Sequence, residues 1–142
     1  MSILRSIMIE YDILEVEKLL GVSAACSTVE VFRDVSKRIL CSSLGESASE
    51  AVLFFLHKGL GRDPFNAFWE DPKAVYCEME RIFGVGARVL INILVAGINR
   101  EYGLNMSPEH FLEIIRDGDQ MAIEEVRSFM RKIAEAHKYR SA

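Results

Sequence analysis

Apolar residues recur at every third or fourth position along most of the chain, which is the spacing of amphipathic helices. In residues 2–20 this spacing places Ile3 and Ile7 on one face, and residues 28–44 repeat it. No segment keeps the strict apolar–polar alternation of a strand, apart from the short run at 6–11. We therefore predict an all-α protein of about seven helices.

Residues that satisfy free backbone groups mark the ends of the predicted helices. Asp63-Pro64, Asp71-Pro72 and Ser107-Pro108 each place a side-chain acceptor before a proline, as at a helix N-terminus. Ser27–Glu30 and Ser47–Glu50 have the Ser-x-x-Glu spacing of a capping box and predict two more starts. The predicted helices cover residues 2–20, 28–44, 47–58, 72–83, 87–102, 108–116 and 121–139, with one or two helical turns at 64–69.

The segment 87–102 is apolar on most sides, so we expect it to be a central helix wrapped by the others. Residues 1–142 are then a single all-helical domain. In this interpretation residues 28–104 form the core, residues 2–20 an amphipathic N-terminal helix and residues 107–139 a C-terminal helical extension.

The balance of charge argues against a nucleic-acid partner. The 142 residues carry 17 Lys and Arg against 21 Asp and Glu, a net charge of −4. Tight binding to phosphates requires a basic surface. However, residues 127–140 are locally basic, which favours either the solvated face of a last helix or a phosphate-binding patch. The basic residues of this stretch are Arg127, Arg131, Lys132, Lys138 and Arg140.

The sequence predicts a cytoplasmic protein. Cys26, Cys41 and Cys77 are odd in number and match no CxxC pattern, which is typical of a reducing compartment. The N-terminal apolar run is too short for a secretory signal. The longest apolar stretch, 89–98, has about half the roughly 20 residues that span a membrane. No membrane association is expected.

No motif of a catalytic, metal or cofactor site is present. His57, His110 and His137 lie in no zinc-binding frame, and there is no G-x-S-x-G nucleophile motif. The turn at 84–86 leads into a helix, but it follows a helix and lacks the remaining residues of a nucleotide-binding loop. An enzyme is therefore the class with least support, and we assign no catalytic, cofactor-binding or metal-binding residue.

Polar residues interrupt the apolar pattern of the central helix on one side. Asn92 and Asn99 are seven residues apart and share a face, with Arg88 one turn before Asn92. Buried asparagines fix the register of symmetric helix–helix interfaces, so this stripe is a candidate interface or ligand site. It also fits the one narrow face of the helix that reaches water.

Aromatic residues concentrate around the single tryptophan, Trp69. Phe65, Phe68 and Tyr76 lie near it in the sequence. Such a cluster is either a core anchored on tryptophan or the lining of an apolar ligand pocket. In the second case the pocket would lie near Phe54, Phe68, Trp69 and the turn 84–88.

Residues 44–104 resemble a small archaeal helical module, the Nitrosopumilus output domain type. The resemblance is carried by Leu44-Gly45, Ala51-Val52, Asp71-Pro72, the string Ile82-Phe83-Gly84-x-Gly86-Ala87 and an apolar helix that ends at Tyr102-Gly103-Leu104. It implies a signalling-output or interaction module, of a kind often found at the C-terminal end of sensor or regulator chains. It carries over no functional residue.

Three functions remain open at this stage. The first is a cytoplasmic interaction or regulatory module without catalytic activity, a homodimer or a binder of another protein, because a terminal amphipathic helix such as 2–20 is a common dimerisation element. The second is a binding protein for a small apolar ligand. The third is a DNA-associated regulator that uses the basic C-terminal helix.

Overall fold

Seven α-helices follow one another in residues 23–141, the part of the chain that the computed structural model describes. The predicted all-α class is confirmed, since these residues contain helices and no strands. The predicted helix 2–20 lies outside the described residues. The helices are α3 (Ser23–Leu44), α4 (Glu46–Leu60), α5 (Pro64–Glu70), α6 (Pro72–Phe83), α7 (Gly86–Tyr102), α8 (Pro108–Asp117) and α9 (Gln120–Ser141).

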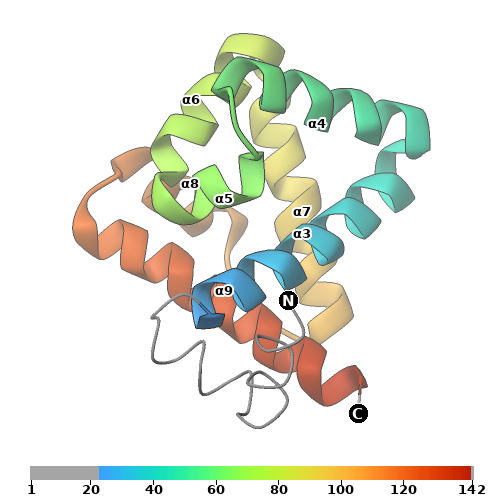
Figure 1. The fold of residues 1–142 in the computed structure, drawn as a ribbon, viewed down its shortest axis with the longest axis vertical. Helices are drawn as coiled ribbons and strands as arrows, with labels where there is room; N and C mark the ends of the chain where they lie inside the picture. The colour runs from blue at the N-terminus through green and yellow to red at the C-terminus, as the bar shows by residue number, and fades with distance from the viewer. Residues whose placement is uncertain (1–22, 142) are drawn as a thin grey trace, which may run out of the picture.

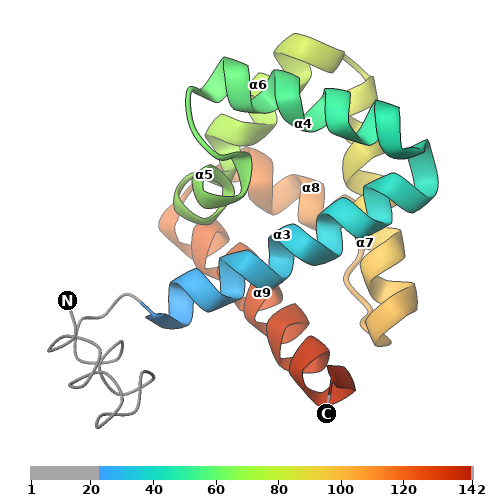
Figure 2. The ribbon, with the colours of Figure 1, turned by 45° about the vertical axis from the view of Figure 1, so that its right-hand side comes forward.

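The helices form a bundle in which α3 and α7 each contact several others (Figure 1). α3 packs against α4, α5, α7 and α9, and α7 packs against α3, α6, α8 and α9. α4 and α6 lie together at one end of the molecule and α9 at the other, as both views show (Figure 2).

The helix α7 is central but not enclosed. Ala87, Val95 and Ile98 are fully buried. On the opposite side Val89 keeps 54% of its surface exposed, and Ala96 is exposed as well. The prediction that other helices wrap this segment therefore holds for one side of α7 only.

A chain of phenylalanine rings links four helices through the core. Phe32 on α3 stacks on Phe68 of α5 at 5.6 Å between ring centroids, and Phe68 stacks on Phe111 of α8 at 6.1 Å. Phe111 meets Phe129 of α9 edge-on at 5.4 Å. The residues 107–139, expected as an extension, thus supply part of the same buried cluster.

Three of the predicted N-terminal caps are confirmed. Asp63 accepts a hydrogen bond from the Phe65 backbone N–H at 3.1 Å. Asp71 accepts one from Ala74 at 3.1 Å, and Ser107 one from His110 at 3.3 Å. In each case a proline occupies the first turn. A residue in the first turn of a helix has no partner for its backbone N–H, so proline, which lacks this group, loses no hydrogen bond there. The pair of a capping residue and a proline is therefore a reliable signal of a helix start.

The two predicted capping boxes are wrong. α3 begins at Ser23, so Ser27 lies inside the helix. α4 begins at Glu46, so Ser47 lies inside its first turn. Gly45 precedes α4 with a φ of 91° and no side-chain cap. The chain therefore passes from α3 to α4 through one glycine with a positive φ, which residues with a Cβ rarely adopt.

Removing the Asp71 cap should lower stability by about 1 kcal/mol, the usual cost of losing an N-cap acceptor. Replacing Asp71 with Ala leaves the Ala74 N–H without this acceptor. Chemical denaturation measures the change. Asp71→Asn is the matched control, because its amide oxygen keeps the acceptor. Equal losses in both variants would contradict the capping role.

Candidate functional site

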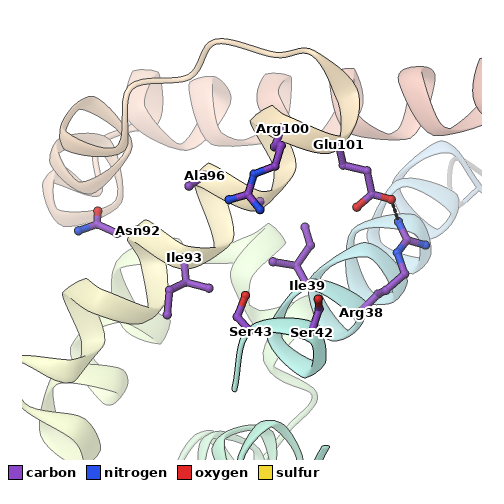
Figure 3. Close-up of a pocket in the computed structure, with 10 residues that line it drawn as sticks. Arg38, Ile39, Ser42, Ser43, Asn92, Ile93, Ala96, Arg100 and Glu101 are labelled. Carbon is purple, nitrogen blue, oxygen red and sulfur yellow. Dashed lines mark hydrogen bonds and ion pairs between the residues drawn. The ribbon is translucent and has the colours of Figure 1, made fainter. Parts of the chain in front are cut away.

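An open groove of about 540 Å³ runs between the second half of α3 and the exposed side of α7 (Figure 3). Its floor is apolar and its rim is polar. The floor residues are Ile39, Ile93, Ala96 and Gly97, and the rim residues are Arg38, Ser42, Ser43, Asn92, Arg100 and Glu101.

The groove exists because α3 and α7 approach closely at one point. Gly97 faces Ile39, and a Cβ on Gly97 would lie 2.5 Å from Ile39 Cγ2. No side chain larger than hydrogen therefore fits at position 97 without movement of Ile39. A glycine inside an apolar helix is the sequence signal for such an approach.

One end of the groove is fixed by a polar cluster that joins α3, α7 and α9. Arg38 pairs with Glu101 and donates a hydrogen bond to the Tyr102 hydroxyl at 3.1 Å. The Tyr102 hydroxyl lies 2.9 Å from His137 Nδ1. Arg140 donates to the Glu101 carbonyl at 2.7 Å. Hydrogen bonding to Tyr102 raises the pKa of Arg38 against the opposing effect of burial, and Glu101 raises it further, so this guanidinium stays charged.

The charged side chains of the groove lining carry one more positive than negative charge. Arg38 and Arg100 both line it, and Arg100 forms no ion pair with any residue that the structure describes. Glu101 is the one carboxylate of the lining, and Arg38 and Arg140 both contact it. Figure 3 shows Ser42 and Ser43 on α3 and Arg100 on α7, on the two sides of the groove. These side chains offer hydrogen-bond donors around an apolar floor.

The three polar residues predicted to form one stripe on α7 have different surroundings in the structure. Asn92 lines the groove, at the end away from Glu101. Asn99 braces the loop after α7, donating to the Met106 carbonyl at 2.8 Å and accepting from the Met106 N–H at 3.1 Å. Arg88 is exposed and does not line the groove.

The aromatic residues predicted to line one pocket also lie in different parts of the structure. Trp69 is half-buried between α5 and α9, with the guanidiniums of Arg127 and Arg131 at 5.1 and 5.4 Å from its ring. Phe68 is buried in the core. Phe54 is 61% exposed and lines an open depression between α3 and α4. These residues do not share one cavity.

The basic stretch on α9 is partly neutralised. Arg127 and Arg131 each contact Glu124, at 3.3 and 3.9 Å, and Arg140 contacts Glu101 at 3.6 Å. Lys132 and Lys138 are exposed.

Among the described residues, no helix is long and apolar enough to cross a membrane. The same part of the chain brings together no group of three or more side chains suited to hold a metal ion.

Sequence reasoning missed most of this groove. Arg38 falls on the solvated side of its predicted helix, and Arg100 and the pair Ser42-Ser43 stand out in no motif. Only Gly97 marks the place where the two helices meet.

Comparison of the chain with protein-family models, curated proteins and solved structures gives no significant match.

Proposed function

We propose that the protein is a cytoplasmic helical interaction module that self-associates, and that residues 2–20 of one copy bind in the α3–α7 groove of a second copy. The observation that carries this proposal is the apolar floor of the groove between rims that hold Arg38 and Arg100. A groove of this kind binds an amphipathic helix through apolar anchors, and rim charges select the partner. The resemblance to an output module supports a function of this kind.

The N-terminal segment has the complementary chemistry. Its apolar side chains repeat at helical spacing, including Ile3, Ile7 and Leu14. As a helix it would be about 28 Å long. It carries two cations and four carboxylates, a net charge of −2. The charged residues are Arg5, Lys18, Glu10, Asp12, Glu15 and Glu17.

The geometry favours a second copy over the same chain. The segment precedes α3, which packs against α9. At one end of the groove, Arg38, Tyr102, His137 and Arg140 link α3, α7 and α9. A segment folding back along its own α3 would meet these side chains before the rest of the groove. A segment from another molecule can enter from the opposite end, at Asn92.

Direct pairing of the α7 helices of two copies is a less suitable way to form a dimer than binding of residues 2–20 in the groove. An antiparallel pair centred near residue 94 would place Arg88 of one copy close to Arg100 of the other, because both lie six residues from the centre. Like charges facing each other across an interface destabilise it. An acidic segment avoids this repulsion.

Free thiols fit the proposed compartment. Cys41 and Cys77 are exposed and unpaired. A reducing environment keeps such thiols from forming disulfides. This agrees with a cytoplasmic location.

Charge reversal in the groove tests the proposal. We expect Arg100→Glu to raise the dissociation constant of the self-associated form about tenfold, since it removes one favourable charge and adds a repulsive one. Sedimentation velocity over a concentration series measures this constant. Arg88→Glu is the matched control, because it makes the same charge change on the same helix outside the groove.

A second full-length variant tests the segment. Replacing Ile7 and Leu14 with Asp interrupts the apolar stripe, and we expect the protein to become monomeric. Circular dichroism checks that both variants remain helical. A wild-type chain that is monomeric at every concentration would overturn the proposal. Equal effects of Arg100→Glu and Arg88→Glu would overturn the assignment to the groove.

A further inference from the structure

A small apolar cavity lies inside the bundle, separate from the α3–α7 groove. Its volume is about 60 Å³, and residues of α3, α4, α5, α6 and α7 line it. Among its lining residues, Val52, Leu53 and Leu94 are only partly buried, which places its opening on the side of α4 and α7. Ser36 of α3 is the only lining residue with a polar side chain.

The hydroxyl of Ser36 has no hydrogen-bond partner among the described residues. Ser36 is 0% exposed, and its Oγ is the one buried side-chain polar atom that the described part of the chain leaves unsatisfied. Buried polar groups in proteins are nearly always hydrogen-bonded, because an unsatisfied one costs free energy. The orphan hydroxyl on the wall of a cavity therefore points to a ligand that supplies the missing hydrogen bond.

The cavity is poorly suited to water. A buried water typically makes two to four hydrogen bonds, and here one hydroxyl faces otherwise apolar walls. The volume is less than half of the roughly 150 Å³ that holds benzene in an engineered apolar cavity. A matching ligand is therefore small, uncharged and largely apolar, with a single hydrogen-bonding group.

We propose that this cavity is a binding site for a short-chain alcohol, or a neutral molecule of that size and chemistry, held by a hydrogen bond with Ser36 Oγ. The apolar body of the ligand packs against side chains such as Leu40, Phe68 and Met79. This site is independent of the groove, so the two proposals can fail separately.

Nuclear magnetic resonance of the full chain tests the site with two probes, 1-propanol and xenon. We expect both to shift the methyl resonances of Leu53 and Leu94. Xenon makes no hydrogen bond, so Ser36→Ala should leave its binding unchanged. The same substitution should weaken 1-propanol binding about two- to tenfold, the loss of one neutral hydrogen bond.

Two further variants sharpen the test. Ser49→Ala is the matched control, because Ser49 is a buried helical serine that does not line this cavity, and it should bind both probes as the wild type does. Ser36→Val fills the cavity and should abolish binding of both. Should Ser36→Val not fold, the contrast between 1-propanol and xenon in Ser36→Ala still decides the question. Equal 1-propanol affinity in Ser36→Ala and wild type, or no shift with either probe, would overturn the proposal.

Discussion

Replacing Phe111 with Ala is expected to lower the free energy of unfolding by about 3–5 kcal/mol, the usual range for a buried phenylalanine. Phe111 is 1% exposed and contacts the rings of Phe68 and Phe129. Truncation loses the transfer free energy of the ring and leaves a cavity where α5, α8 and α9 meet. Because a domain is stable by only about 5–15 kcal/mol, this change removes a large part of the total. Urea denaturation followed by circular dichroism measures it.

A second phenylalanine provides the control for this experiment. Phe54 is 61% exposed, and its one ring contact among the described residues is with Phe55 at 5.5 Å. Phe54→Ala should change stability by no more than about 0.5 kcal/mol. A loss below about 1 kcal/mol in Phe111→Ala would contradict the observed core, since it would mean that α8 and α9 add little to the stability of the bundle.

The substitution Gly97→Ala is expected to destabilise the protein by up to about 2 kcal/mol. In an open helix this change would stabilise by about 1 kcal/mol, because alanine has the higher helix propensity. Here the added Cβ would lie 2.5 Å from Ile39 Cγ2, and overpacking of a tight contact typically costs about 1–3 kcal/mol. Ile39 is β-branched and 6% exposed, so it has little freedom to move away.

Another glycine of the same helix supplies the matched control. A Cβ on Gly86 would lie 3.5 Å from Phe83 Cβ, an ordinary contact, so Gly86→Ala should be neutral or stabilising. A double-mutant cycle with Ile39→Ala isolates the contact, since that substitution removes Cγ2. In the Ile39→Ala background, Gly97→Ala should become stabilising. Destabilisation by Gly97→Ala in both backgrounds would place its cause elsewhere.

Local sequence signals predicted the helices well where the chemistry of the cap is unambiguous. Asp63, Asp71 and Ser107 precede prolines, and a proline can follow a cap but cannot continue an upstream helix without breaking a hydrogen bond. The Ser-x-x-Glu spacing at Ser27 and Ser47 is less specific, because serine and glutamate are also tolerated inside helices. In the structure α3 begins before Ser27 and α4 begins before Ser47.

The groove required information that no single helix contains. Arg38 and Arg100 are 62 positions apart and meet at one groove only because α3 and α7 approach at Gly97. Periodicity identifies the buried side of each helix but does not determine which helices become neighbours. For the same reason Asn92 and Asn99 share a helix face in sequence but have different neighbours in the structure: one lines the groove and the other braces a loop.

The position of Trp69 makes its intrinsic fluorescence a probe of the contact between α5 and α9. It is the only tryptophan of the chain, and its ring on α5 lies under two guanidiniums of α9. Its emission should therefore change when α9 separates from α5, as the indole loses these neighbours and gains water. A fluorescence transition that precedes the loss of ellipticity during denaturation would show that α9 detaches before the remaining helices melt. Coincident transitions would show that the described helices unfold as one cooperative unit.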